Sequence, residues 1–238
     1  MALPKSVVIL TGAGISAESG LGTFRDKDGI WTKYPLEDLA TPEGFARNPD
    51  FVQGFYNDRR RQLKTAKAHA GHAALARLQT HMEAAGHSFT LVTQNVDNLH
   101  EQAGSTDVLH MHGELTKIRC MDCYDVIEWH SDIGREVPCP ACETAGYLRP
   151  HVVWFGEIPL YMDEISRTLS TCDLFVSIGT SGAVYPAAGF VQEALYAGAQ
   201  TMELNLEPSE NAHVFSEARY GPASEIVPAW VDELISVL

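Results

Sequence analysis

The chain has 238 residues, of which 45% are hydrophobic and 20% charged, with 19 glycines and 12 prolines, so we expect a folded globular protein and not a disordered or collagen-like chain. Uninterrupted apolar runs reach only four residues, as in VVIL at 7–10, which argues against a membrane helix or a signal peptide and predicts a cytoplasmic protein without a membrane partner. The 17 Lys and Arg against 31 Asp and Glu give a net charge of -14, which repels phosphate backbones and argues against nucleic acid as a partner.

The predicted elements alternate between strands and helices. Residues 6–11 read as a buried strand that runs into a glycine turn and a helix start, and residues 21–68 lack a strand pattern. Leu75, Leu78 and Met82 share one helix face, and a final helix begins near Val227 with Pro228 in its first turn. Further strands are predicted at 89–93, 173–178 and 201–206. This alternation predicts an α/β fold with a doubly wound parallel sheet, interrupted at about 116–152 by an inserted module.

Four of the five cysteines predict a metal site in that module. Cys120 and Cys123 form one CxxC pair, and Cys139 and Cys142 form a second after fifteen residues, a spacing typical of a structural zinc site. Two disulfides are the alternative, but they require an oxidising compartment. Four thiolates close the coordination sphere, so this zinc would stabilise a fold and not activate water. Cys172 is interpreted as a small buried hydrophobe.

Each predicted main strand is followed by small or polar residues. These are GAGIS (12–16), QNVDN (94–98), GTS (179–181) and NLE (205–207). Because the carboxyl ends of parallel strands meet at one edge of a sheet, the segments predict one shared ligand site. Gly12-x-Gly14-x-x-Ala17 matches the dinucleotide-binding pattern, although a tight turn without a ligand remains open. No acidic residue ends a second strand about twenty residues on, so a hydride-transferring Rossmann enzyme is disfavoured.

The run HMHGEL (110–115) places His110 and His112 two residues apart, but no third residue is spaced to complete a metal site. His112 stands out because Gly113 leaves room for the backbone beside it. A structural role is expected for His69, His72, His81, His87, His130, His151 and His213.

In this order along the chain, the motifs resemble those of the sirtuins, the NAD-dependent protein lysine deacylases. The motifs are GAGIS, SGLGTFR (19–25), TQNVDNLH (93–100), HGEL (112–115), both CxxC pairs, GTS and NLE, and the match runs from about residue 6 to 237. The resemblance implies one catalytic domain over 1–238, with NAD and one structural zinc per chain. A Rossmann-like NAD-binding part would comprise 1–115, with a helical insertion at about 21–68, and 153–238, and a zinc module would comprise 116–152.

The resemblance also implies roles for individual residues. The phosphates would be held by Ala13, Gly14, Ser16, Gly179, Thr180 and Ser181. The adenosine half would be bound by Asn205, Glu207 and Ala223. Phe24 and Arg25 would cover the nicotinamide, while Gln94, Asn95 and Asp97 would bind its ribose and carboxamide. The cofactor-binding set is completed by Gly12, Ala17, Thr23, Trp31, Val96, His112 and Leu206.

The implied reaction is a transfer of the acyl group from lysine to ADP-ribose. Nicotinamide leaves the ribose, the acyl oxygen attacks the same carbon, and His112 acts as general base on a ribose hydroxyl. The products are free lysine, nicotinamide and O-acyl-ADP-ribose. Imidazole suits this step because its unperturbed pKa lies near neutral pH. His112, Asn95 and Asp97 are the residues to which the resemblance assigns the chemistry.

The implied partner is an acylated lysine of a protein substrate, bound as an extended peptide. Residues Val153, Phe155, Gly156 and Glu157 in RPHVVWFGE would form the strand that pairs with the peptide backbone. A buried core strand is the alternative for this run.

Tyr56 and Arg59 are three residues apart, hence on one helix face. They are similar to the Tyr-x-x-Arg pair with which class III sirtuins read the carboxylate of succinyl- or malonyl-lysine, and Ala17 would leave room for the longer acyl chain. Arginine offers a fixed fork that matches a carboxylate. In the alternative, Tyr56 packs inward while Arg59, Arg60 and Arg61 form a solvated basic face.

Three other functions remain open from sequence. An ADP-ribosyltransferase would use the same NAD contacts but transfer ADP-ribose to a protein. A non-catalytic zinc-ribbon module would only hold a nucleotide. A zinc hydrolase is disfavoured by the closed four-thiolate sphere. The sequence leaves the oligomeric state open, and a monomer is compatible with it.

Overall fold

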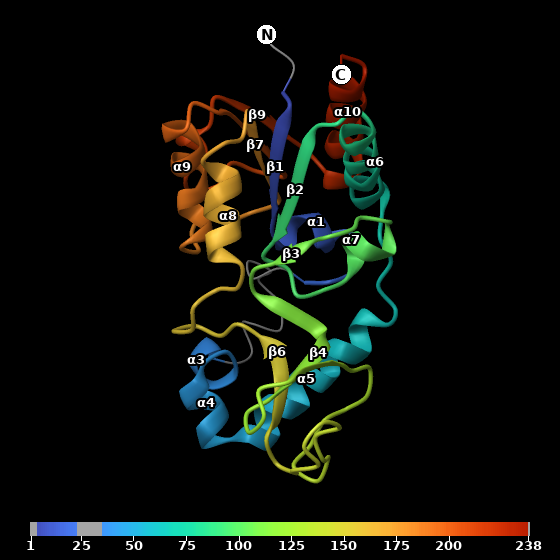
Figure 1. Cartoon of the computed structure of the whole chain (residues 1–238), viewed down its shortest axis with the longest axis vertical. Coiled ribbons are helices and arrows are strands. Elements are labelled where there is room, and N and C mark those ends of the chain that lie inside the picture. The colour runs from blue at the N-terminus through green and yellow to red at the C-terminus, as the bar shows by residue number, and fades with distance from the viewer. Residues whose placement is uncertain (1–3, 23–34, 238) are drawn as a thin grey trace.

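The computed structural model describes residues 4–22 and 35–237, and its centre is a six-stranded parallel sheet (Figure 1). The strand order is β3-β2-β1-β7-β8-β9, which is the order of a dinucleotide-binding Rossmann sheet. The strands are β1 (Ser6–Thr11), β2 (Ser88–Thr93), β3 (Leu109–His110), β7 (Leu174–Ile178), β8 (Gln200–Asn205) and β9 (Glu217–Tyr220). In β1, Val7 and Ile9 face one apolar core while Val8 and Leu10 face another, so both faces of the sheet are buried.

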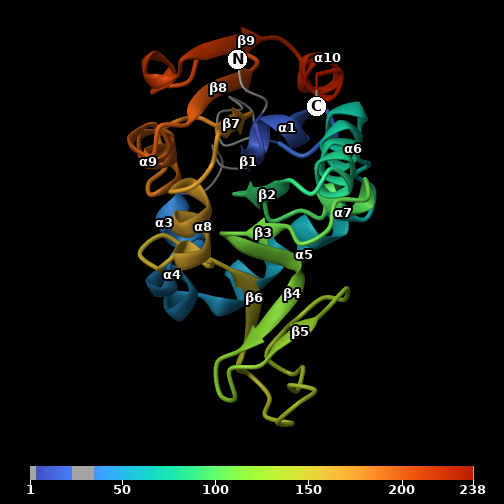
Figure 2. The same ribbon diagram turned by 45° about the horizontal axis from the view of Figure 1, so that its top comes forward.

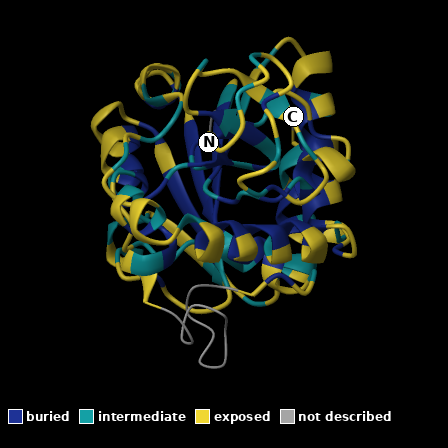
Figure 3. Cartoon of the chain, turned by 90° about the horizontal axis from the view of Figure 1, so that it is seen from below, coloured by how far each residue is buried: buried dark blue, intermediate teal, exposed yellow. Residues whose placement is uncertain are grey.

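Helices cover both faces of this sheet. On one face α6 (Ala70–Ala84) packs against α10 (Ala223–Ile235). On the other lie α8 (Met162–Leu169) and α9 (Phe190–Tyr196), with the short 3₁₀ turn η1 (Ala187–Gly189) before α9. The buried sheet and the exposed outer faces of the helices are separated clearly in Figure 3. Among the described residues no helix is both long and apolar enough to cross a membrane.

A second, antiparallel sheet lies at one end of the molecule (Figures 1 and 2). Its order is β5-β4-β6, formed by β4 (Gly113–Cys120), β5 (Val126–Glu128) and β6 (Leu148–Val152). The helix α5 (Pro49–Leu63) packs against β4 and β6. The remaining elements are α1 (Ala13–Ala17), α3 (Leu36–Leu39), α4 (Pro42–Arg47), α7 (Leu99–Gln102) and η2 (Ala212–Val214).

The structure confirms the strands predicted at 6–11, 89–93, 173–178 and 201–206 to within one residue at each end. The predicted start of the last helix is wrong, because α10 begins at Ala223 and Pro228 lies in its interior. Glu18 accepts hydrogen bonds from the Ser224 backbone N–H, at 3.0 Å, and from its hydroxyl, and thereby satisfies groups of the first turn. The helix can therefore begin before the proline, whose ring only removes one donor further along.

Candidate functional site

The glycine turn lies where the order of the parallel sheet reverses, between β1 and β7. The N–H of Gly12 donates to Ile178 O at 3.0 Å, and the N–H of Gly14 donates to Gly179 O at 2.8 Å. A Cβ at Gly14 would lie 2.7 Å from the Cα of Gly179, which itself has φ +63. Both positions therefore require glycine. The bond from the Gly14 N–H to Gly179 O shows that Gly14 allows close packing of the two turns.

Three buried polar side chains form a chain beside this turn. Asn95 Nδ2 donates to Gly12 O and to Ser16 Oγ, both at 3.0 Å, and Ser16 Oγ donates to Asp97 Oδ2 at 2.9 Å. The resemblance puts Ser16 among the phosphate ligands, whereas the structure directs its hydroxyl to Asn95 and Asp97. Burial raises the pKa of Asp97, and hydrogen bonds from the Leu99 N–H and from Ser16 oppose that rise. The geometry thus brings Asn95 and Asp97 together, as expected.

His112 lies just outside β3 and is held by the residue next to Asn95. Its Nδ1 lies 3.1 Å from the carbonyl oxygen of Gln94. Because a carbonyl can only accept, Nδ1 carries the proton, and the lone pair of the neutral ring is on Nε2. Nε2 has no hydrogen bond to any described residue, and neither does the side chain of Gln94. Burial lowers the pKa of His112 below its ordinary value of 6.5, which keeps the ring neutral at neutral pH.

His110 has a different role from His112. Its Nε2 pairs with Glu101 Oε1 at 2.7 Å, and its Nδ1 lies 3.1 Å from Asn95 O. The pKa of His110 is raised, since the contacts with Glu101 outweigh the effect of burial. The two histidines of HMHGEL therefore do not share a ligand, and His110 instead fixes the backbone of Asn95. The motif drew attention to His110, but only the fold identifies Glu101 as its partner.

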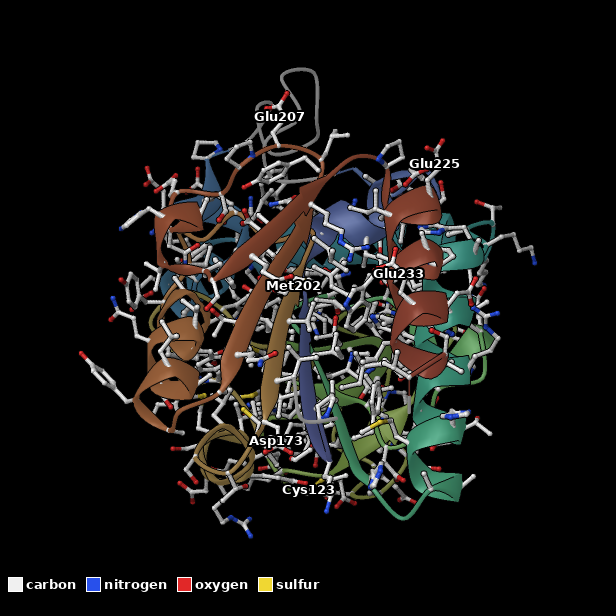
Figure 4. All side chains as sticks on the ribbon, turned by 90° about the horizontal axis from the view of Figure 1, so that it is seen from above. Cys123, Asp173, Met202, Glu207, Glu225 and Glu233 are labelled. Atoms are coloured by element: carbon white, nitrogen blue, oxygen red, sulfur yellow. The ribbon has the colours of Figure 1, made fainter. Side chains whose placement is uncertain are left out.

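The predicted adenosine contacts lie at the carboxyl edge of β7 and β8. Asn205 Nδ2 donates to Thr180 O at 2.8 Å, and Asn205 Oδ1 accepts from Leu206 N at 3.0 Å. Leu206 is 67% exposed, and Glu207 is also exposed. Figure 4 shows Glu207 and Asp173 at opposite ends of the strands.

The other residues predicted to contact the cofactor lie on several segments and differ in burial and hydrogen bonding. Ser181 accepts from Ala183 N at 3.2 Å, and Ala223 begins α10 half-buried. Val96 accepts from Leu115 N at 2.8 Å. Ala13 is half-buried and Ala17 is exposed in α1. The predicted contacts Thr23, Phe24, Arg25 and Trp31 lie outside the described residues.

Tyr56 and Arg59 lie together on α5. Tyr56 packs inward, as in the alternative interpretation, but Arg59, Arg60 and Arg61 do not form one solvated basic face. Tyr56 is 6% exposed and Arg59 is half-buried. Arg60 is 2% exposed and donates through Nε to Leu115 O at 2.9 Å, so only Arg61 is in solvent, where it pairs with Asp58 and Asp132. The guanidinium of Arg59 makes no hydrogen bond to any described residue, and burial lowers its pKa.

The expected strand over Val153, Phe155, Gly156 and Glu157 is wrong, because β6 ends at Val152 and a turn follows. The N–H of Val153 donates to His112 O at 2.8 Å, and that of Phe155 donates to Ala40 O at 2.8 Å. The N–H of Glu157 donates to Trp154 O at 3.0 Å, which closes the turn, and Gly156 within it has φ +88. The apolar pattern of VVWF did not reveal this turn, since Trp154 is buried while Phe155 is 49% exposed.

Cys120 at the end of β4 and three cysteines in the adjacent loops form a cluster that could hold a metal ion. Their Sγ atoms all lie within 4.8 Å of one another, with Cys120 to Cys142 at 3.8 Å and Cys123 to Cys139 at 3.7 Å. Tetrahedral coordination with Zn–S bonds of about 2.3 Å gives sulfur separations of about 3.8 Å, so the set fits a zinc ion. Cys172 is 4% exposed and lies outside the cluster, as expected of a buried hydrophobe.

Replacing Cys139 with serine is expected to abolish stoichiometric zinc binding and to lower the free energy of unfolding by more than about 4 kcal/mol, because metal binding to four thiolates stabilises only the folded chain. Metal analysis and denaturant unfolding of the purified variant measure both effects. Cys172→Ala is the matched control, since it removes a buried thiol but no ligand. Full zinc content in Cys139→Ser would contradict the assignment.

The sheet order, the glycine turn and the four-thiolate module together define a Rossmann-type nucleotide-binding protein with a structural metal site. The Sir2 family model matches residues 12–186. The chain therefore belongs to the Sir2 family, the sirtuins.

Relatives and solved structures agree with this family. An NAD-dependent protein deacylase of Caulobacter vibrioides is 59% identical over 232 residues, which is 98% of each chain. One of Escherichia coli K12 is 57% identical over 98% of this chain and 83% of its own length. A Sir2 homologue in complex with NAD is 36% identical, with a TM-score of 0.87 over 98% of this chain and 91% of the other. A Sir2 protein with a deacetylated p53 peptide and 3′-O-acetyl-ADP-ribose is 27% identical, with a TM-score of 0.81 over 97% and 94%.

Proposed function

We propose that this chain is an NAD-dependent protein lysine deacylase that favours acyl groups ending in a carboxylate, such as succinyl and malonyl, over acetyl. The observation that carries the deacylase assignment is His112, whose proton is on Nδ1 and whose Nε2 has no hydrogen bond to a described residue. The carbonyl that holds it belongs to Gln94, the residue directly before Asn95 of the Asn95–Ser16–Asp97 chain. The relatives named NAD-dependent protein deacylase and the Sir2 structures holding NAD and acetyl-ADP-ribose support it. The partner is an acylated lysine of a protein substrate.

The described residues fit NAD at the switch point of the sheet. Gly12, Gly14 and Gly179 let the turns after β1 and β7 pack directly against each other at the carboxyl edge of the sheet, where a dinucleotide binds in this fold. When bound, NAD supplies a ribose carbon that can exchange nicotinamide for the acyl oxygen of the substrate. The Asp97 carboxylate is fixed by Ser16 and by the Leu99 N–H, so it is preorganised to orient a carboxamide. In this proposal His112 Nε2 accepts a proton from a ribose hydroxyl, and the bond from Nδ1 to Gln94 O leaves its lone pair available for that step.

The proposed preference for a charged acyl group rests on two donors of α5 that find no acceptor among the described residues. Neither the Arg59 guanidinium nor the Tyr56 hydroxyl donates to a described residue, and each influences the pKa of the other by charge. The charge of Asp97 partly offsets the burial of this guanidinium, but among the described residues no carboxylate accepts a hydrogen bond from it. A carboxylate at the end of the acyl chain would supply that partner, and the fork of arginine matches its geometry.

The proposal is tested with purified enzyme on acetyl and succinyl versions of one peptide, with and without NAD. We expect NAD-dependent release of nicotinamide and formation of O-succinyl-ADP-ribose, detected by mass spectrometry, with a higher kcat/KM for the succinyl peptide. Transfer of ADP-ribose to protein with no O-acyl-ADP-ribose would instead identify an ADP-ribosyltransferase. We propose the cytoplasm as the compartment, because a four-thiolate site requires reduced cysteines.

The pH profile of turnover gives a separate prediction. Because burial lowers the pKa of His112, the neutral base predominates at pH 7 and is lost only as the pH falls through that lowered pKa. We expect kcat/KM to fall on the acid side with a midpoint below 6.5, measured from about pH 5 to about pH 8. A midpoint above 6.5 would show that a group other than a buried neutral His112 controls the fall on the acid side.

A further inference from the structure

Within the described part of the chain the Tyr56 hydroxyl makes one hydrogen bond, and in it the oxygen is the acceptor. The indole Nε1–H of Trp154 donates to Tyr56 Oη at 2.9 Å, and both side chains are buried, at 6% and 2% exposed. Since the indole can only donate, it occupies a lone pair of the phenol oxygen. The phenolic hydrogen must therefore point elsewhere, and it finds no acceptor among the described residues.

Trp154 is itself held from several sides. The Arg149 guanidinium carbon lies 3.4 Å from the centre of the indole, and the Phe45 ring lies 5.2 Å from it. Arg149 binds both carboxylate oxygens of Glu157, at 2.7 and 3.0 Å, and Glu157 also accepts from the Trp154 backbone N–H at 2.8 Å. The direction of the indole N–H is thus fixed before any ligand binds.

We infer that Trp154 is a positioning residue for acyl selectivity: its indole N–H orients the Tyr56 hydroxyl so that the phenolic hydrogen is available to the terminal carboxylate held by Arg59. This inference rests on the proposed preference for charged acyl groups. Burial raises the pKa of Tyr56 to about 12, so the phenol keeps its proton throughout the working range of pH. Glu157 and Arg149 act one step further away, by fixing the plane of the indole.

The test replaces Trp154 with phenylalanine, which removes the N–H but keeps an aromatic face for Arg149 and Phe45. We expect KM for a succinyl peptide to rise about 3- to 10-fold, as for the loss of one oriented hydrogen bond, with a much smaller change in kcat. The succinyl-to-acetyl ratio of kcat/KM should fall by a similar factor. A succinamyl peptide, the neutral amide isostere, serves as the control substrate and should respond less than the succinyl peptide.

A double-mutant cycle separates positioning from general damage. In a Tyr56→Phe background, Trp154→Phe is expected to have little further effect on the ratio, because the oriented hydroxyl is already absent. Equal losses on the acetyl and succinyl peptides, or additive effects in the cycle, would overturn the inference. Should Trp154→Phe fail to fold, β-(3-benzothienyl)alanine at position 154 removes the N–H with the shape of the indole retained.

Parallel assays distinguish failure of this inference from failure of the proposed function. If the wild-type enzyme shows no preference for the succinyl peptide, the proposed acyl preference fails. If Arg59→Met lowers the succinyl-to-acetyl ratio but Trp154→Phe does not, only the positioning role of Trp154 fails.

Discussion

Replacing His112 with alanine is expected to lower kcat for NAD-dependent deacylation by about 10²- to 10⁴-fold, the range typical of a lost general base. Nδ1 is bound to Gln94 O, so Nε2 is the only ring atom that can take a proton, and no titratable side chain among residues 4–22 and 35–237 hydrogen-bonds to the ring. In the variant, water would have to accept the proton of the ribose hydroxyl in place of the imidazole. Formation of O-acyl-ADP-ribose, followed by mass spectrometry, measures the loss on both acetyl and succinyl peptides.

His213→Ala is the matched control for this variant, because His213 is exposed in η2 and makes no hydrogen bond to any described residue of the His112 site. It should retain the rate of the wild-type enzyme. Retention of more than about a tenth of wild-type kcat in His112→Ala would contradict the assignment of the base. Thermal unfolding of both variants establishes that the chain is folded.

Replacing Arg59 with methionine is expected to lower kcat/KM for a succinyl peptide by about 10- to 100-fold and to affect an acetyl peptide far less. The magnitude is that of a charge-assisted hydrogen bond to a carboxylate in a half-buried site. Methionine retains most of the length and apolar volume of the arginine stem, so the change is chiefly the loss of charge and donors. Steady-state kinetics on the two matched peptides measure the effect.

Arg61→Met is the control, since it makes the same change in net charge two residues away on the same helix. Arg61 is exposed and pairs with Asp58 and Asp132, so it should alter neither activity beyond a small factor. Equal losses on both peptides in Arg59→Met would remove the claim that Arg59 reads the acyl carboxylate.

The main strands were predictable because a parallel strand buried on both faces must be apolar throughout, as in residues 7–10 and 174–176. β3 has two residues and β9 lies at the exposed edge with mostly polar side chains, so neither carries that signal. The four-thiolate site was also predictable, because metal geometry constrains ligand spacing within two short loops.

The site was predictable as a set of segments but not as a hydrogen-bond pattern. Because the carboxyl ends of parallel strands meet at one edge, the sequence correctly grouped Gly12, Asn95 and Gly179 at that edge of the sheet. It could not show that the Ser16 hydroxyl joins Asn95 to Asp97, because that contact depends on side-chain rotamers across 79 and 81 residues of chain. Likewise, the burial of Arg60 depends on α5 packing against β4, which no local pattern in FYNDRRRQL encodes.

The strand β4 has a further consequence for the integrity of the enzyme. It begins at Gly113, directly after His112, and ends on Cys120, so this one strand, with an irregularity between Glu114 and Ile118, connects the proposed base to the four-cysteine site. The position of the His112 imidazole therefore depends on the metal site that holds the other end of the strand. Thiol oxidants or chelators that remove the metal would release the Cys120 end of β4 and allow the imidazole of His112 to move. We therefore expect them to inhibit turnover without competing with NAD.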